Sequence, residues 1–259
     1  MEQSAKISRS PLVSTRNLFN LIGGFPRQLM RVNLLRFIWS AARWFLYAII
    51  LRRMRTLDTV GDGVSKNTIS HNMRSILDLS VNRSLRLILP LVAIENIRRN
   101  IEKKKILSIG PRTEGEYWNL VSWGFRRKNI SAVDLISYSP LIQLADMHRL
   151  PFGDSEFDVV IAGWVLAYSD KKDVAAAEII RVLRPGGLVA LGVEWRARSV
   201  EETSEKLGYT AGSTEFIHNR DDLLRHFSGH VDHVYFDHDE SGGAEAQMGD
   251  ILVIFRCKK

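Results

Sequence analysis

From residue 105 onward, short apolar runs alternate with segments whose apolar positions have helical spacing. The short runs predict buried strands, and the segments between them predict helices. The expected strands are 106–109, 130–135, 157–162, 188–194, 231–237 and 251–256. The expected helices are 114–123, 172–183, 199–207 and 220–227, the last capped by Asn219, and a polar loop is expected at 239–249. This order predicts an α/β fold with a mostly parallel sheet that is covered by helices on both faces.

The first hundred residues follow a different pattern. We expect three parts in the chain: a basic extension at 1–60, a helical linker or cap at 61–104 and the α/β domain at 105–259. The segment 1–30, rich in Ser, Arg and Asn, is expected to be loosely ordered. Helices are expected at 33–51, 70–79 and 84–104, with a loop at 59–66. Pro90 should kink or split the last of these helices.

The segment 33–51 has a narrow polar stripe on an otherwise apolar helix; its members are Arg36, Ser40, Arg43 and Tyr47. Two arginines in nineteen residues argue against a membrane span, since each costs roughly 2.5–3.5 kcal/mol at the centre of the bilayer. One interpretation places residues 31–55 on an anionic membrane surface. Another packs the helix on the domain, over its substrate side. A mitochondrial presequence is a third interpretation, because the segment is rich in Arg and Ser and poor in acids.

Composition narrows the class of protein. Hydrophobic residues make up 45% of the chain and charged residues 25%, as in globular proteins. The net charge of +7 comes from residues 1–60, which hold ten basic and two acidic residues, whereas the rest is close to neutral. The charge pattern therefore does not indicate a basic nucleic-acid-binding surface on the folded domain. The only cysteine, Cys257, excludes a disulfide framework and fits a cytoplasmic location, with peripheral membrane attachment as an addition.

The stretch 106–115 reads as a buried strand, a tight turn at Gly110-Pro111 and the start of a helix. Such a turn is where nucleotide-like cofactors sit in α/β proteins, because the backbone approaches closely and the first helical N–H groups point outward. An ordinary strand-to-helix turn would show the same pattern.

Five further segments give the chain a family resemblance: Ile-Leu-Ser-Ile-Gly at 106–110, Val-Asp-Leu at 133–135, Ala-Asp-Met-His-Arg-Leu-Pro-Phe at 145–152, Phe-Asp-Val-Val-Ile-Ala-Gly-Trp-Val-Leu at 157–166 and Glu-Ile-Ile-Arg-Val-Leu-Arg-Pro-Gly-Gly-Leu-Val-Ala-Leu at 178–191. In order and spacing, residues 106–195 resemble the class I S-adenosylmethionine-dependent methyltransferases of the small-molecule type. The resemblance implies a Rossmann-like, doubly wound sheet of seven strands that closes with an antiparallel pair. It also implies S-adenosylmethionine as cofactor.

The glycine-rich turn departs from the family pattern. Ser108 stands where the family commonly has an acid, and Arg112 and Glu114 occupy two of the three glycine positions. Arg112 is too large for a backbone that hugs the cofactor, so we expect the loop to take another path. Glu114 or Glu116 is expected to replace the missing acid at the cationic end of the cofactor, or else to stabilise the helix N-terminus.

The resemblance places the cofactor among residues from four strand ends. Asp134 matches the acid that holds the ribose hydroxyls, and Asp146 matches the acid at the adenine amino group. Only twelve residues separate these two acids, so the helix and third strand usual between them are expected to be shortened or missing. The candidate cofactor-binding residues are Gly110, Pro111, Arg112, Glu114, Gly115, Asp134, Leu135, Asp146, Met147, Gly163 and Trp164.

Methyl transfer needs positioning more than a fixed set of catalytic groups. His148 and Tyr168 are the candidate catalytic residues, because either side chain can take a proton from an oxygen acceptor. Tyr138 and Trp195 lie at expected strand ends as well. Several C-terminal histidines lack a closed ligand set, so no metal is expected.

The sequence therefore predicts a methyltransferase that acts on a small-molecule or lipid-like acceptor. The alternative is an inactive scaffold of the same fold, docked to a membrane or a partner protein, which the altered glycine turn favours. A nucleic-acid methyltransferase is disfavoured, because the fourth strand is followed by Ala-Gly-Trp-Val and not by an Asn/Asp-Pro-Pro-aromatic run.

Overall fold

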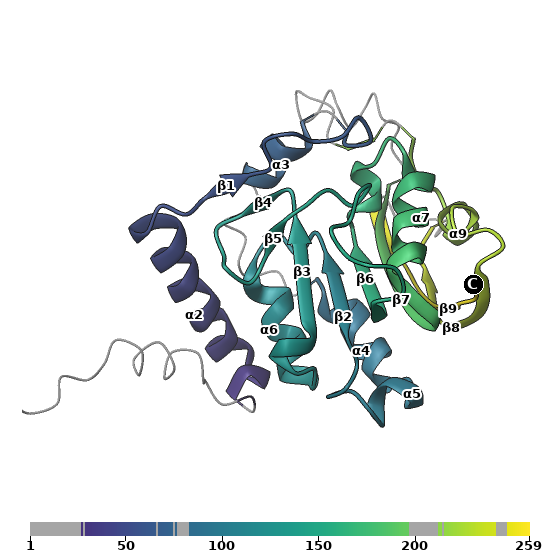
Figure 1. Ribbon diagram of the computed structural model, residues 1–259, viewed down its shortest axis with the longest axis horizontal. Helices are drawn as coiled ribbons and strands as arrows, with labels where there is room; N and C mark the ends of the chain where they lie inside the picture. Colours follow the sequence, from purple (N-terminus) through teal and green to yellow (C-terminus); the bar gives the residue numbers. More distant parts are fainter. Residues whose placement is uncertain are drawn as a thin grey trace, which may run out of the picture.

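The computed structural model describes residues 27, 29–65, 67–74, 76, 83–196, 212–213, 215–241 and 248–259. The expectations for 1–26 and for a helix at 199–207 lie outside these residues, as do 77–80 and 242–247. Figure 1 shows one central sheet with helices on both of its faces.

The sheet has seven strands in the order β5-β3-β2-β6-β7-β9-β8. Strands β5, β3, β2, β6 and β7 run parallel, and β9 is antiparallel to both β7 and β8. The bounds are β2 Ile106–Ile109, β3 Ile130–Asp134, β5 Gln143–Leu144, β6 Phe157–Gly163, β7 Leu183–Arg196, β8 Val231–Asp239 and β9 Met248–Cys257. The predicted fold class is confirmed, closing antiparallel pair included.

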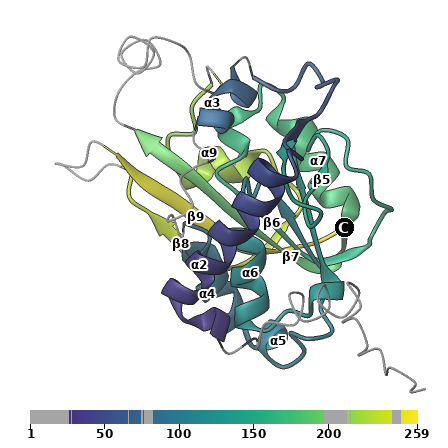
Figure 2. The same ribbon diagram turned by 90° about the vertical axis from the view of Figure 1, so that its left-hand side faces the viewer.

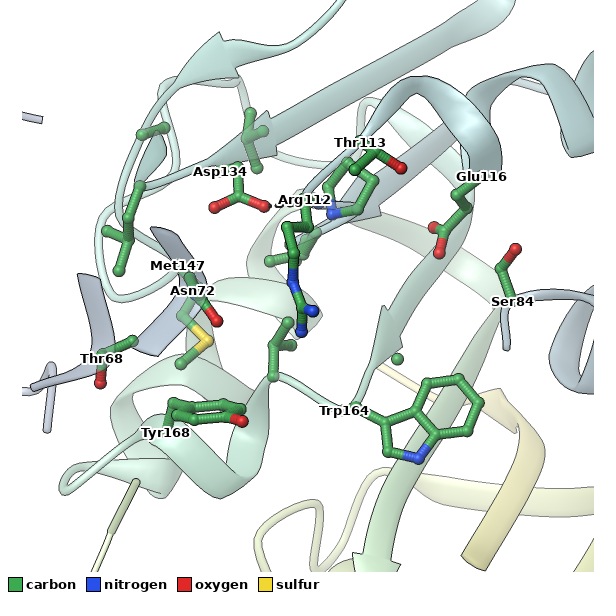
Figure 3. A pocket seen from close by; sticks show the side chains of 18 of the residues that line it. Thr68, Asn72, Ser84, Arg112, Thr113, Glu116, Asp134, Met147, Trp164 and Tyr168 are labelled. Carbon is green, nitrogen blue, oxygen red and sulfur yellow. Dashed lines mark hydrogen bonds between the residues drawn. The ribbon is translucent and has the colours of Figure 1, made fainter. Parts of the chain in front are cut away.

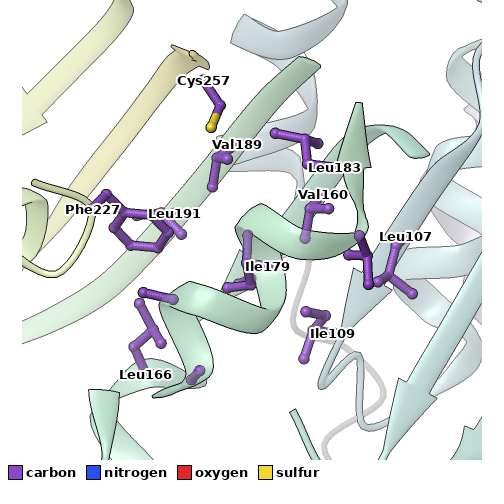
Figure 4. Close-up of a cluster of buried hydrophobic side chains, with 14 of the residues drawn as sticks. Leu107, Ile109, Val160, Leu166, Ile179, Leu183, Val189, Leu191, Phe227 and Cys257 are labelled. Carbon is purple, nitrogen blue, oxygen red and sulfur yellow. The ribbon is translucent and has the colours of Figure 1, made fainter. Parts of the chain in front are cut away.

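The two faces of the sheet carry separate cores. On one face, α7 (Lys172–Val182) and α9 (Arg220–Arg225) cover a cluster that includes Leu107, Ile179 and Phe227 (Figure 4). On the other face, α4 (Leu85–Ala93) and α6 (Glu114–Trp123) cover Ile106, Val159 and Ile254. All four residues of β2 are buried, as the continuous apolar run predicted.

The connection between β3 and β5 is short, as the spacing of the two acids predicted. Residues 135–142 contain no helix, and β5 has only two residues, paired with the end of β3. Within this connection, β4 (Ile136–Ser137) pairs antiparallel with β1 (Arg55–Thr56). The N-terminal strand β1 thus lies beside the short connection between β3 and β5, where a longer β5 and a helix would otherwise be expected.

Most of the other predicted elements have close counterparts. Helix α3 is Thr68–Arg74, α5 is Glu95–Arg98, and three short helical turns are η1 Leu29–Arg31, η3 Arg127–Asn129 and η4 Leu166–Tyr168. The expected break at Pro90 occurs later: the proline stays inside α4, and the chain leaves the helix at Ile94, whose ψ is 123°. Asn219 caps α9 by accepting a hydrogen bond from the backbone N–H of Asp222 at 2.8 Å.

The predicted helix at 33–51 is present as α2 (Asn33–Trp44), continued by the π-helical segment η2 (Phe45–Ile50). It lies against α6 on the outside of the molecule (Figures 1 and 2). Its polar stripe faces inward, because all four of its members are buried: Arg36, Ser40, Arg43 and Tyr47. Its outward side carries the exposed apolar residues Leu34, Phe37, Ile38, Phe45, Ile49 and Ile50.

The inward stripe corrects two expectations about this helix. Arg36 and Arg43 are buried, so neither is available to lipid headgroups. The helix does pack on the domain, but it covers α6 and not the substrate side, since none of its residues lines the cavity described below. Among the described residues, no helix is both long and apolar enough to cross a membrane.

Candidate functional site

A cavity of about 350 Å³ opens at the carboxyl ends of β2, β3, β6 and β7 (Figure 3). Ligands bind at this edge in open parallel sheets, because the strand order reverses there. The cap over it comes from the N-terminal part of the chain and includes Val64, Thr68, His71, Asn72, Arg83 and Ser84. The sheet side supplies Ile109, Gly110, Pro111, Arg112, Thr113, Glu116, Val133, Asp134, Leu135, Ala145, Asp146, Met147, Gly163, Trp164, Val165, Tyr168 and Glu194.

The turn after β2 combines one glycine and one arginine in left-handed backbone conformations. Gly110 has φ 71°, and a Cβ there would lie 2.1 Å from Cγ1 of Val165, so only glycine fits. Arg112 has φ 55°, a conformation that costs a non-glycine residue roughly 1–2 kcal/mol. The backbone at 112 thus keeps a conformation that glycine favours although its side chain is large. Thr113 then caps α6 by accepting from the backbone N–H of Gly115 at 3.3 Å.

Asp134 joins the end of β3 to this turn. Its Oδ2 accepts from the backbone N–H of Arg112 at 2.7 Å, and its Oδ1 accepts from the backbone N–H of Ile136 at 3.3 Å. Its side chain is buried beside the cavity, and burial raises the pKa of its carboxyl to about 6. Each oxygen of this buried carboxyl still keeps a lone pair for a ligand.

Glu116 brings a carboxylate back to the place where the strand has serine. Its Oε1 accepts a hydrogen bond of 2.5 Å from the Ser108 hydroxyl, although the two residues lie on different elements. Burial and the nearby charge of Asp134 raise the pKa of Glu116 to about 7, against the effect of the Ser108 hydrogen bond. Glu116 thus supplies the cavity with an acid beside Ser108, the position where the family commonly has one.

Glu114 and Gly115 do not line the cavity. The Glu114 carboxylate is fully buried and forms an ion pair with Arg43, so it is not placed to meet a cofactor. Trp118 Nε1 and the Ser139 hydroxyl also donate to it, at 2.9 and 2.5 Å. Tyr138, another residue named from the sequence, is buried and accepts from the backbone N–H of Glu114 at 3.2 Å.

His148 holds the cap in place and does not line the cavity. Its Nδ1 lies 2.6 Å from Oδ1 of Asp146, and its Nε2 lies 2.7 Å from the hydroxyl of the buried Ser169. The ring lies against Gly63, where a Cβ would come within 2.6 Å of it. Both ring nitrogens are therefore engaged, which leaves neither for a bound acceptor and argues against the expected general-base role.

Asp146 does line the cavity, and it also binds the cap. Its Oδ2 accepts from the backbone N–H of Gly61 at 3.0 Å. Hydrogen bonds from His148 and from backbone N–H groups, together with the charge of His148, outweigh burial and lower the pKa of the Asp146 carboxyl. An isolated β-bridge between Val64 and Ser169 attaches the cap a second time, a few residues after Gly61.

The wall opposite the turn is aromatic. Trp164 has φ 60°, and its Nε1 donates to Asp250 at 2.8 Å. The Arg83 guanidinium lies 5.0 Å from the centre of the Trp164 ring and 3.5 Å from Oε2 of Glu194. Tyr168 packs near His71, with 5.6 Å between the ring centres.

Most of the residues named from the sequence converge on the cavity, except Glu114, Gly115, Tyr138, His148 and Trp195. Sequence reasoning missed Arg83, Ser84, His71, Asn72 and Glu194. Glu194 ends an expected strand beside the named Trp195, so its position was a usable signal. The cap residues come from the part of the chain without a family pattern, and no signal marked them. Among the described residues, no group of three or more His, Cys, Asp and Glu is arranged to hold a metal ion.

Comparison with known proteins agrees with this fold. Residues 125–191 match a family model described as methyltransferase domain. The chain is 29% identical over 108 residues to the ubiquinone/menaquinone biosynthesis C-methyltransferase UbiE of Desulfotalea psychrophila, covering 34% of this chain and 44% of that protein. It is 40% identical over 53 residues to an uncharacterized protein of Mycobacterium tuberculosis, 20% of this chain and 19% of that one. The chain spans less than half the length of these curated relatives.

Solved structures share the fold at low sequence identity. The N-methyltransferase NodS of Bradyrhizobium japonicum, solved with S-adenosylhomocysteine, has a TM-score of 0.51 at 17% identity, over 75% of this chain and 100% of that one. A putative methyltransferase of Haloferax volcanii, solved with the activator Trm112, has a TM-score of 0.52 at 15% identity, over 76% and 98%. The strand order and the match over residues 125–191 show that this chain contains a methyltransferase domain with the class I, S-adenosylmethionine-dependent fold.

Proposed function

We propose that the cavity binds S-adenosylmethionine and that the protein transfers its methyl group to a small-molecule acceptor. The observation that carries this proposal is the pairing of Glu116 with Ser108. It places a carboxylate at the end of β2, beside the Gly110 turn, although the strand itself has no acid. A carboxylate in this position suits the ammonium group at the methionine end of the cofactor.

The remaining donor set fits the rest of the cofactor. The Asp134 carboxylate has lone pairs for the two ribose hydroxyls, and Leu135 lies next to it on the cavity wall. Asp146 and Met147 line the side expected for adenine, where the thioether suits contact with a ring. Bound there, S-adenosylmethionine supplies an electrophilic methyl group.

The acceptor side is proposed to lie between Trp164 and Tyr168. Both side chains line the cavity from the β6 end and the turn that follows it, and the cap residue His71 closes over Tyr168. The protein would hold the acceptor in line with the methyl group and exclude water, since positioning alone supplies about 7–11 kcal/mol. Tyr168, in its phenolate form, is proposed to take the proton of an oxygen acceptor, because both ring nitrogens of His148 are already engaged.

The outward face of α2 and η2 supports a second proposal, that the protein associates with an anionic membrane surface. This face is apolar over its length, and Arg52, Arg53 and Arg55 are exposed just beyond its C-terminal end. No acidic residue occurs from 29 to 57. Helices bind at a membrane interface by burying apolar side chains and by electrostatic attraction, and each nearby arginine contributes about 1 kcal/mol at an anionic surface. A lipid-like acceptor would then be within reach of the enzyme.

The inactive-scaffold alternative rests on the Arg112 side chain, which enters the cavity that the cofactor would fill. Calorimetric titration of the pure, full-length protein with S-adenosylhomocysteine separates the two. Binding at micromolar concentration is the expected result; it should be lost in Glu116→Ala but kept in Glu156→Ala, a half-buried glutamate that does not line the cavity. Absence of binding by folded wild-type protein would refute the methyltransferase proposal and favour the scaffold.

A further inference from the structure

Arg112 places a guanidinium inside the cavity, and among the described residues its charge acts on Asp134, whose pKa it lowers against the effect of burial, without a hydrogen bond or ion pair. Figure 3 shows its side chain extending from the turn into the cavity, which it helps to line. Within the described part of the chain, no ion pair or hydrogen bond of this guanidinium is observed. Arg83, the other arginine of the cavity, differs in this respect, because it contacts both Glu194 and the ring of Trp164.

The backbone at Arg112 adds a second observation. Its φ of 55° lies in the left-handed region, where glycine is favoured and a long side chain is strained. Its backbone N–H fixes Asp134, but any residue except proline supplies that hydrogen bond. The backbone of the turn therefore does not require an arginine at this position, although the charge of Arg112 lowers the pKa of the buried Asp134 carboxyl.

The acids around the cavity are already engaged. Asp134 accepts from two backbone N–H groups, Glu116 accepts from Ser108, and Asp146 accepts from Gly61 and His148. An arginine presents a planar fork of donors that matches a carboxylate in two parallel hydrogen bonds. A half-buried guanidinium, without a hydrogen bond or ion pair among the described residues, is thus able to bind an anionic group that arrives with a ligand.

We propose that Arg112 binds the carboxylate of a ligand in this cavity. This inference rests on the proposed function and deepens it. Two ligands can bring that group: the cofactor through its amino-acid end, or the acceptor through an acid group of its own. In the first case Arg112 and Glu116 clamp the carboxylate and the ammonium of one amino acid. In the second case Arg112 restricts the enzyme to carboxylate-bearing acceptors.

The test uses two pairs of probes on the full-length protein, measured by calorimetry. S-Adenosylhomocysteine is compared with its decarboxylated analogue, 5′-S-(3-aminopropyl)-5′-thioadenosine, which keeps the ammonium and lacks only the carboxylate. Benzoate is compared with benzyl alcohol on protein saturated with S-adenosylhomocysteine. The variants are Arg112→Gly and Arg112→Gln, and Arg149→Gln removes an exposed arginine outside the cavity as a charge control.

Arg112→Gly removes the guanidinium without straining the turn, because glycine favours the backbone conformation at φ 55°. Its thermal midpoint should equal or exceed that of wild type, so a loss of binding would not reflect misfolding. If the cofactor brings the carboxylate, both variants lower the preference for S-adenosylhomocysteine over its analogue by about 10- to 100-fold. If the acceptor brings it, that preference stays and the preference for benzoate over benzyl alcohol disappears. Arg149→Gln should change neither preference.

Three outcomes overturn the inference. Both preferences could be the same in wild type and variants, which would leave the guanidinium without a ligand. Arg112→Gly could tighten both nucleosides equally, which would make the side chain an obstruction. A wild-type protein that binds neither nucleoside would refute the proposed function, and the inference would fall with it, whereas the first two outcomes refute the role of Arg112 alone.

Discussion

Arg43 and Glu114 form a buried ion pair that ties the outer helix α2 to the first turn of α6, directly behind the turn that lines the cavity. Nη2 of Arg43 donates to Oε1 of Glu114 at 2.9 Å, and Nε of Arg43 donates to Oε2. The guanidinium also lies 4.9 Å from the centre of the Tyr47 ring. The polar stripe of α2 therefore serves the interior of the protein, and the position of the cofactor turn depends on the helix behind it.

Arg43→Met should strongly destabilise the fold, because it leaves the Glu114 carboxylate buried without a counter-charge. Losing one partner of a buried pair costs roughly 3–5 kcal/mol. Arg43→Met combined with Glu114→Gln should recover much of this loss, since a neutral glutamine can accept from Trp118 with its amide oxygen and donate to the Ser139 hydroxyl with its amide nitrogen. Denaturant unfolding of the single and double variants measures the loss of stability and its recovery. A double variant as unstable as Arg43→Met would show that the unpaired Glu114 charge does not cause the destabilisation.

The centre of the sheet could be predicted from the sequence because β2, β3 and β6 are almost fully buried and read as apolar runs. The direction in which α2 faces could not. A narrow polar stripe on an apolar helix normally faces water, and only the partner Glu114, 71 residues later, turns Arg43 inward. The turn residues were located correctly, but the two glutamates of α6 separated in space: Glu116 lines the cavity and Glu114 lies behind it.

Binding of S-adenosylhomocysteine should tighten as the pH rises from 5.5 to 7.5. The pKa of Glu116 is raised to about 7 by burial, so the free protein is largely protonated there at pH 6 and must lose this proton to meet an ammonium group. Calorimetry in buffers of different ionisation enthalpy should show proton release on binding. Glu116→Gln should bind more weakly and lose the pH dependence near pH 7, keeping only the part near pH 6 where Asp134 titrates.

The same raised pKa makes a prediction about stability. A carboxyl whose folded pKa exceeds its unfolded value of about 4.3 contributes stability at low pH that is lost as the pH rises through the folded value of about 7. The free energy of unfolding of the ligand-free protein should therefore fall less between pH 5 and pH 7.5 in Glu116→Gln than in wild type. Equal pH dependence in both proteins would mean that Glu116 titrates normally.

Asp134→Asn should weaken cofactor binding while keeping the fold. The amide oxygen of asparagine can still accept the shorter hydrogen bond, from the backbone N–H of Arg112. Its amide nitrogen replaces the oxygen that accepts the longer bond from Ile136 and that would serve the ribose. We expect a loss of about 2–4 kcal/mol in the binding of S-adenosylhomocysteine and a thermal midpoint close to that of wild type. Asp134→Ala should lower both the affinity for S-adenosylhomocysteine and the thermal midpoint, because it also leaves the backbone N–H of Arg112 without its acceptor. An unchanged affinity in Asp134→Asn would exclude Asp134 as the ribose ligand.

The outward face of α2 and η2 should bind vesicles that contain anionic lipid. Apolar side chains such as Phe37, Ile38 and Ile50 are 41%, 53% and 58% exposed, so replacing them with aspartate removes no core contact. Phe37→Asp combined with Ile50→Asp should abolish cosedimentation with phosphatidylserine-containing vesicles and leave the thermal midpoint within about 2 °C. Arg52→Gln combined with Arg53→Gln should weaken binding at low salt and matter less at high salt, because only the electrostatic attraction is lost.

Vesicles of phosphatidylcholine alone provide the matched control, and binding to them should be several-fold weaker because the arginines then find no anionic headgroups. Self-association of the chain through the same face is the competing explanation for its exposed apolar residues. Sedimentation of the wild-type protein without lipid distinguishes the two. A dimer that dissociates in the Phe37→Asp and Ile50→Asp double variant, with no vesicle binding by wild type, would refute the membrane proposal and assign this face to a second copy of the chain.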